Sequence, residues 1–203
     1  MMKSLHIIFA LLIINGTLSQ QLENSGFEQW ENVGTGEEEP LSWSSTKTSD
    51  NSSLNGLAPQ VISRSTDAHT GTYAAKLVNK NVPFVNIVAN GILTNGIIHT
   101  TTNPQDSYVY TDVNSSDHSQ PFTSYPDSIV GWYKYAPQGN DVGNIQVLLH
   151  GSYGQLPIDA STSIIALAEF DFSANSNWTR FSTPFIYYPC LLYTSDAADE
   201  HGC

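Results

Sequence analysis

Polar and aromatic residues in the last third of the chain fall on alternate positions of four candidate β-strands. Trp132 and Lys134 share one side of the strand expected at 128–136, because successive side chains of a strand point to opposite faces. An aromatic ring with amide, carboxylate and basic neighbours is typical of a sugar-binding surface, where the ring stacks on C–H groups and the polar groups bind hydroxyls. The same alternation over 143–150, 163–172 and 178–188 adds five residues to one predicted ligand face: Gln146, His150, Glu169, Asp171 and Arg180.

The same residues support two other interpretations. Trp132 and Trp178 are also suited to a core, since buried aromatic rings are common in β-sandwiches. Glu169 and Asp171 lie two residues apart on one side of a strand, so they are candidates for the two carboxyls of a glycoside hydrolase. A structural or adhesive surface module would need no small ligand. An exposed ring with polar neighbours favours binding, a deep cleft with two convergent carboxyls favours hydrolysis, and the lack of both favours adhesion.

The elements that must position these residues are β-strands. Runs with a period of two residues recur, and no stretch keeps an apolar period of about 3.6 residues for several turns. Turn signals such as Asn55-Gly56 and Asn90-Gly91 separate the runs. This pattern predicts an all-β fold, an antiparallel β-sandwich or barrel. The candidate strands cover 59–64, 72–79, 83–93, 107–113, 128–136, 143–150, 163–172 and 178–188.

The two ends of the chain differ from the part between them. Residues 1–19 resemble a secretory signal peptide, with Lys3 before a short apolar run and small residues up to Ser19. We therefore expect an exported protein, either secreted or at the cell surface. Residues 190–200 resemble the translation of an adapter used in sequencing libraries, so 190–203 are treated as a tail. Cys190 and Cys203 both fall in that tail, so the rest of the chain has no cysteine with which to form a disulfide.

Charge and length restrict the partners of the remaining part, 20–189, which is long enough for one domain. It holds 6 Lys and Arg against 16 Asp and Glu, a net charge near −10. Such a chain offers no basic surface for nucleic acid or anionic lipid. No second apolar run is present, so we expect no membrane insertion of the mature chain. Neutral ligands such as glycans are compatible with this charge.

A series of motifs in order carries a resemblance to a known family. Asn24-Ser-Gly-Phe-Glu28 is followed by Pro40-Leu-Ser-Trp43 and then by 69–77. The match is narrowed by 90–96 and by the strand 126–135 with its Gly-Trp-Tyr-Lys-Tyr sequence. From about residue 21 to 188 the chain resembles carbohydrate-binding-module-like jelly rolls, and in particular the exported Bacteroidetes-type carbohydrate metabolism domains.

The resemblance implies a fold, a role and a metal. The fold is a β-sandwich of jelly-roll type, here without the Asp-bearing strand that closes such domains, and the role is recognition or utilisation of a glycan or polysaccharide. Such jelly rolls often hold a structural Ca²⁺ near the opening motif, and Glu28 maps onto a ligand position there. The alternative for Glu28 is a side chain that caps a turn.

Overall fold

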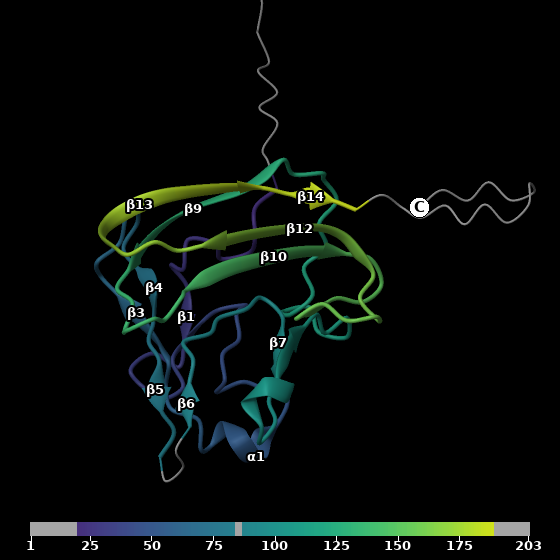
Figure 1. Cartoon of the computed structure of the whole chain (residues 1–203). Coiled ribbons are helices and arrows are strands. Elements are labelled where there is room, and N and C mark those ends of the chain that lie inside the picture. The colour runs from purple at the N-terminus through teal and green to yellow at the C-terminus, as the bar shows by residue number, and fades with distance from the viewer. Residues whose placement is uncertain (1–19, 84–86, 189–203) are drawn as a thin grey trace, which may run out of the picture.

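Antiparallel strands make up nearly all the regular structure in the computed structural model, which describes residues 20–83 and 87–188 (Figure 1). The segments 1–19 and 190–203, expected to be a signal peptide and a tail, lie outside the described residues. In the described part, helical structure is confined to α1 (Ser52–Asn55) and a 3₁₀ turn at Pro104–Asp106. None of these described helices is long and apolar enough to cross a membrane. The strands are β1 (Trp30–Glu31), β2 (Glu39–Pro40), β3 (Ile62–Ser65), β4 (Ala74–Leu77), β5 (Lys80–Asn81), β6 (Val88–Ala89), β7 (Ile97–His99), β8 (Tyr108–Tyr110), β9 (Ser128–Tyr135), β10 (Asn144–His150), β11 (Gln155–Leu156), β12 (Ile164–Asp171), β13 (Asn175–Pro184) and β14 (Ile186–Tyr187).

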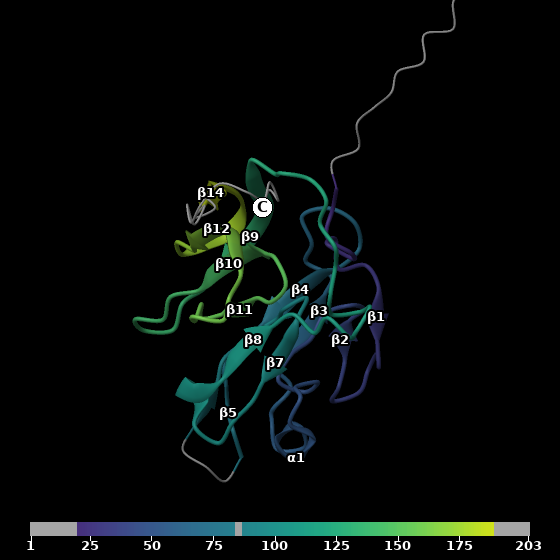
Figure 2. The same ribbon diagram turned by 90° about the vertical axis from the view of Figure 1, so that its right-hand side faces the viewer.

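Two sheets lie against each other in the part of the molecule that carries most of the predicted site (Figures 1 and 2). In one sheet, β12 lies between β10 and β14, and in the other β9 pairs with β13. Every pairing in both sheets is antiparallel. The chain passes from one sheet to the other at Phe185, between β13 and β14. The layers are thus tied together by a strand that changes sheets, a common way to build a sandwich corner.

Aromatic rings fill the space between these two sheets. Tyr133 of β9 stacks on Phe172 with ring centroids 4.5 Å apart, and Phe181 of β13 stacks on Phe170 at 5.3 Å. Ala166 and Ala168 of β12 complete this side with exposed fractions of 0% and 2%. Burying a phenylalanine side chain contributes roughly 1.5–3 kcal/mol, so this cluster is a main source of stability. It also fixes which side of each strand faces inward.

The remaining strands form smaller sheets beneath this sandwich. β8 lies between β11 and β7, and β3 pairs with β4 through four consecutive residue pairs. Val61, Ile62 and Ile98 are buried here, with exposed fractions of 2%, 1% and 4%. The pairs β1-β2 and β5-β6 have two residues in each strand. Because these strands are so short, the structure of the lower part depends largely on the loops between them.

The all-β antiparallel sandwich expected from the periodicity is confirmed, and its jelly-roll connectivity and missing closing strand stay predictions. Two strand predictions are wrong in detail. The strand expected at 83–93 is reduced to β6, because Val82 N–H donates to the carbonyl of Ile87 and the chain turns between β5 and β6. The strand expected at 178–188 begins earlier, at Asn175, and is interrupted at Phe185.

Glycine at position 131 is required by the aromatic cluster, and this predicts the effect of adding a methyl group. A Cβ at Gly131 would lie 2.5 Å from Cε1 of Phe181, whose ring is held by Phe170 and Phe172. Gly131→Ala should therefore lower the free energy of unfolding by about 1–3 kcal/mol in urea denaturation. Gly36→Ala is the control, because a Cβ there meets no atom within 4 Å. Equal stabilities for the two variants would contradict the packing described here.

A buried carboxyl at the β1-β2 pair makes a second stability prediction. Glu39 is 0% exposed; its Oε1 accepts a hydrogen bond from Ser45 N at 3.0 Å and another from Ser45 Oγ, whereas Oε2 has no partner among the described residues. Burial raises the pKa of Glu39 above its ordinary value of 4.5, and this effect exceeds the opposing one of the Ser45 hydrogen bonds. The native state thus binds a proton more tightly than the unfolded chain. Well below about pH 4.5, Glu39 is protonated in both states and its burial does not lower the free energy of unfolding. As the pH rises through the native pKa of Glu39, the free energy of unfolding falls, because only the unfolded chain ionises this group without penalty.

Glu39→Gln should therefore be more favourable near neutral pH than in acid. We expect the free energy of unfolding of Glu39→Gln, relative to the wild type, to be higher at about pH 7.5 than at about pH 4.5. Urea titrations at both pH values measure this difference, and Glu37→Gln at an exposed neighbouring position is the control. A relative stability that is the same at both pH values would show that Glu39 is not penalised by burial.

Candidate ligand-binding faces

Trp132 lies at the surface, in a group of aromatic and charged residues that we call the Trp132 patch. It is 45% exposed on the outer side of β9, and Arg180 of β13 lies directly opposite it. The ring of His69 stacks on the indole with centroids 3.6 Å apart and planes at 12°. Since Tyr133 and Phe181 point inward, alternation places Trp132 and Arg180 outward. The patch consists of Asp67, His69, Trp132, Lys134, Trp178 and Arg180.

Asp67 connects the charged and aromatic members of the patch. Lys134 Nζ donates to both carboxylate oxygens of Asp67, at 2.8 and 2.7 Å, and Trp178 Nε1 donates to Oδ1 at 3.1 Å. The hydrogen bond from Lys134, and then that from Trp178, lower the pKa of Asp67. The Lys134 ammonium also lies 5.3 Å from the centre of the Trp178 ring, a cation–π contact. These contacts hold the side chains of the patch in place before any ligand arrives.

Arg180 is the basic residue of the patch whose charge is unmatched. Its guanidinium makes no hydrogen bond or ion pair with any residue of the described part. A guanidinium offers five N–H donors, which suit carboxylate or hydroxyl oxygens of a ligand. The patch therefore combines a half-exposed indole with donors that are free to bind.

Glu28 positions the loop that brings Asp67 and His69 to the patch. The loop 66–73 joins β3 to β4, and Glu28 Oε1 accepts hydrogen bonds from the N–H groups of Thr72 and Tyr73 at 2.9 and 3.1 Å. Gly71 has a φ of +72°, and a Cβ there would collide with the Glu28 carboxylate. Only glycine adopts this conformation easily and leaves room for the carboxylate. Glu28 is therefore a turn cap in this structure.

This geometry bears on the calcium expected at Glu28. Ca²⁺ takes six to eight oxygen ligands, whereas Glu28 Oε1 accepts hydrogen bonds from two backbone N–H groups. Within residues 20–83 and 87–188, no group of three or more His, Cys, Asp or Glu side chains is arranged to hold a metal ion. The contacts of Glu28 fit a capped turn, and calcium at this position stays a prediction from the resemblance.

Gln146, Glu169 and Asp171 lie on a different face from the Trp132 patch. Gln146 Nε2 donates to Glu169 Oε1 at 2.6 Å across β10 and β12. Their strands turn Ile145 and Phe170 toward the aromatic cluster, so these polar side chains point out of the other side of the sandwich. The single face predicted from the alternation is thus divided between two sheets. The reason is that the apolar sides of β9 and β12 pack against each other.

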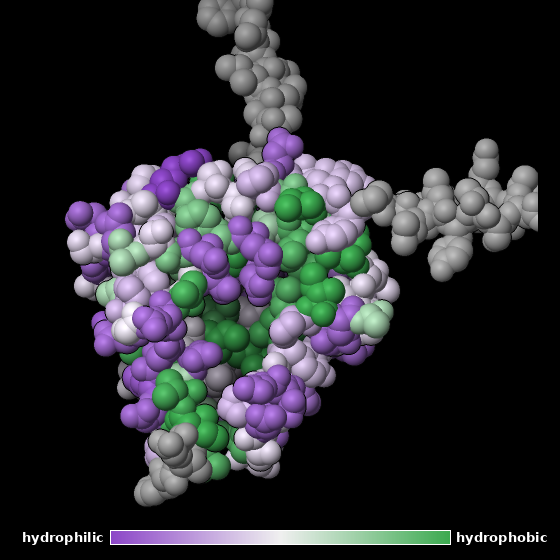
Figure 3. Space-filling model, in the orientation of Figure 1, coloured by the Kyte–Doolittle hydropathy of each residue, from purple (hydrophilic) through white to green (hydrophobic). Residues whose placement is uncertain are grey.

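The outer face of β10, β12 and β14 is mixed in polarity (Figure 3). A hollow of about 280 Å³ is lined by Asn144, Glu169, Phe170 and Asp171. Glu169 and Asp171 are both exposed on it. Toward β14 the face becomes apolar, with Ile165 40% and Ile186 67% exposed. The two carboxyl groups considered for hydrolysis therefore lie on an open surface.

His150 is separated from both faces by an irregularity in β10. The register shifts between Leu149 and His150, which places His150 opposite Ile164, on the inner side of β12. There its Nε2 lies 2.7 Å from Thr111 Oγ1 and its ring packs against Gly154. A bulge of this kind reverses the side on which the next residue lies, and period-two alternation cannot anticipate it.

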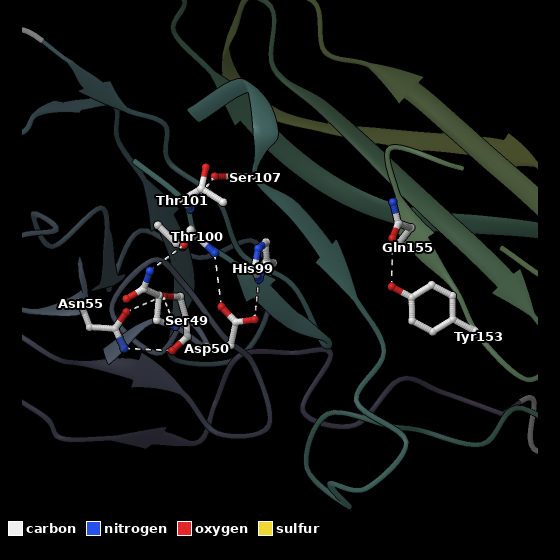
Figure 4. Close-up of polar contacts among 10 residues, drawn as sticks. Ser49, Asp50, Asn55, His99, Thr100, Thr101, Ser107, Tyr153 and Gln155 are labelled. Atoms are coloured by element: carbon white, nitrogen blue, oxygen red, sulfur yellow. Dashed lines mark hydrogen bonds and ion pairs between the residues drawn. The ribbon is translucent and has the colours of Figure 1, made fainter. Parts of the chain in front are cut away.

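One polar and aromatic group was not among the residues predicted for the site. Asp50 Oδ2 lies 2.7 Å from His99 Nδ1, and Tyr153 donates to Gln155 Oε1 at 2.9 Å (Figure 4). His99 in turn stacks on Tyr108, with centroids 4.6 Å apart. The alternating Tyr108 and Tyr110 are a signal in the sequence, but Asp50 and His99 are 49 residues apart and no motif links them.

Comparison with protein-family models, with curated proteins and with solved structures gives no match for this chain.

The turn cap leads to a prediction for Glu28. Glu28→Ala should lower the free energy of unfolding by about 1 kcal/mol, since two N–H groups lose their acceptor at a partly solvated position. Thermal and urea unfolding measure this, with Glu23→Ala as a control on an exposed glutamate. If Glu28 acts as a cap alone, EDTA leaves the melting temperature of the wild type unchanged. A melting temperature that falls with EDTA in the wild type, and not in Glu28→Ala, would instead establish the predicted Ca²⁺.

Proposed function

We propose that this protein is an exported glycan-binding module and that the Trp132 patch is its platform for sugar. The observation that carries the proposal is the exposure of Trp132. Trp132 lies on the outward side of a strand whose other side forms the aromatic core, and 45% of this large apolar side chain is exposed. Exposed aromatic rings with polar neighbours are the common feature of sugar sites.

The contacts around Trp132 support this role in detail. His69 covers one face of the indole, so a sugar ring would use the part of Trp132 that remains exposed, bordered by Trp178 and Arg180. Lys134 and Asp67 neutralise each other and fix the position of Trp178. Arg180 then supplies donors for ring or hydroxyl oxygens. A platform with side chains already in place loses less conformational entropy when it binds.

Binding is better supported than hydrolysis by the faces described. Glu169 and Asp171 are two residues apart on an open sheet surface, and Gln146 holds the Glu169 carboxylate. Hydrolysis needs two carboxyls on either side of a scissile bond, in a site that excludes water. An adhesive role without a small ligand would not explain the exposed indole of Trp132 or the unpaired guanidinium of Arg180.

Trp132→Ala tests the proposal. We expect it to weaken glycan binding at least tenfold in a glycan-array screen followed by calorimetry, because the stacking surface is lost. The melting transition should stay cooperative. Val130→Ala is the matched control, since Val130 lies on the same side of β9 and is also 45% exposed. Loss of the cooperative melt in Trp132→Ala would identify Trp132 as a core residue, and unchanged binding would exclude the patch as the platform.

A further inference from the structure

The sheet of β7, β8 and β11 carries an aromatic face that the Trp132 patch does not include. The register places His99 opposite Tyr108, and Tyr110 between Ile97 and Gln155. Ile98, 4% exposed, and Val109 fall on the other side, toward the core. Alternation therefore gathers the rings on the side away from the core. We call this set the tyrosine face: His99, Tyr108, Tyr110, Tyr153 and Gln155.

The rings of the tyrosine face form a row across two strands. His99 stacks on Tyr108 at 4.6 Å, and Tyr108 lies 5.9 Å from Tyr110 by ring centroids. All of these residues are half-buried, so each ring is held by neighbours and also reaches the surface. Successive rings in a row offer stacking surfaces to successive units of an extended ligand.

The polar groups of this face are partly fixed and partly free. The Asp50 carboxylate lies against Nδ1 of His99, and Gln155 Oε1 accepts a hydrogen bond from the Tyr153 hydroxyl (Figure 4). Gln155 Nε2 donates to the carbonyl of Pro157. Within the described part of the chain, the hydroxyls of Tyr108 and Tyr110 and Nε2 of His99 have no hydrogen-bond partner. The fixed groups orient the rings, and the free ones can bind hydroxyls of a ligand.

The charge around the tyrosine face differs from that of the Trp132 patch. Burial raises the pKa of Tyr110, and the nearby carboxylates Asp50 and Asp112 raise it further. Burial and then Tyr108 and Asp159 have the same effect on the pKa of Tyr153. A surface bordered by carboxylates disfavours an anionic ligand. Aromatic rings with free hydroxyls and negative surroundings suit a neutral sugar.

We propose that the tyrosine face is a second glycan-binding surface, separate from the Trp132 patch, that takes a neutral pyranose chain. The inference takes its ligand class from the proposed function and shares no residue with the patch. Figure 1 places β7 well below β9 and β13, and Figure 2 places β7 and β8 below β9. Two surfaces on one chain would bind a polysaccharide with greater avidity than either alone.

Calorimetric titration of the full chain with neutral hexasaccharides tests this inference, after the melt of each variant has been checked. We expect two sites in the wild type. Tyr108→Ala or Tyr110→Ala should leave one site, and Trp132→Ala should also leave one. A variant that combines Trp132→Ala with either tyrosine substitution should have none. Tyr125→Ala is the control, since this tyrosine is 83% exposed and lies outside both surfaces. If the alanine variants do not fold, Tyr108→Phe with Tyr110→Phe keeps the rings and should weaken one of the two sites by about tenfold.

The outcomes separate this inference from the proposed function. A single site that Trp132→Ala removes and the tyrosine variants leave unchanged would overturn the second surface and keep the patch. Binding that the tyrosine variants remove and Trp132→Ala leaves intact would support the tyrosine face and overturn the patch. Absence of binding to every neutral hexasaccharide tested would overturn the tyrosine face, and the patch would then be judged by its own glycan screen.

Discussion

The aromatic cluster between the two sheets is the constraint on which the candidate patch depends. Tyr133, Phe170, Phe172 and Phe181 pack together. Tyr133, Phe170 and Phe181 occupy the inner sides of β9, β12 and β13, and Phe172 directly follows β12. A strand cannot turn one residue inward without turning the next one outward. The packing of Tyr133 therefore exposes Trp132, and the packing of Phe170 exposes Glu169. Stability and the presentation of functional groups arise from the same alternation.

A second link runs from the N-terminal motif to the patch. Glu28 caps the turn at Thr72 and Tyr73, and the loop that this turn ends supplies Asp67 and His69. Asp67 then fixes Lys134 and Trp178, and His69 covers Trp132. Residues more than a hundred positions apart are joined here by a few hydrogen bonds at the surface. The net charge of the protein is strongly negative, but Lys134 is paired with Asp67 at this surface, so the Arg180 guanidinium gives the patch a local positive charge next to Trp132.

Sequence periodicity predicts the strands that hold the core, but it does not predict how the residues of the site are arranged. The strands β9, β10 and β12 lie within one residue of the predicted bounds at each end, because their alternation runs through seven or eight residues. Strands of two or three residues such as β7 and β11 are too short to show a period. The bulge before His150 and the contact of Asp67 with Lys134 depend on tertiary packing, which no local pattern encodes. The sequence placed seven residues on one face, whereas packing of the two apolar sides divides them.

The indole N–H resonances allow the most direct measurement of the central claim, that Trp132 presents a sugar platform. The chain has four tryptophans in different surroundings: Trp30 and Trp43 donate to backbone carbonyls, Trp178 donates to Asp67, and Trp132 lies on the surface. Two-dimensional NMR of the ¹⁵N-labelled protein during titration with a bound glycan follows all four at once. The account predicts saturable shifts of the Trp132 and Trp178 indole signals while those of Trp30 and Trp43 stay in place. Shifts confined to Trp30 and Trp43, or glycan binding that moves none of the four signals, would contradict it.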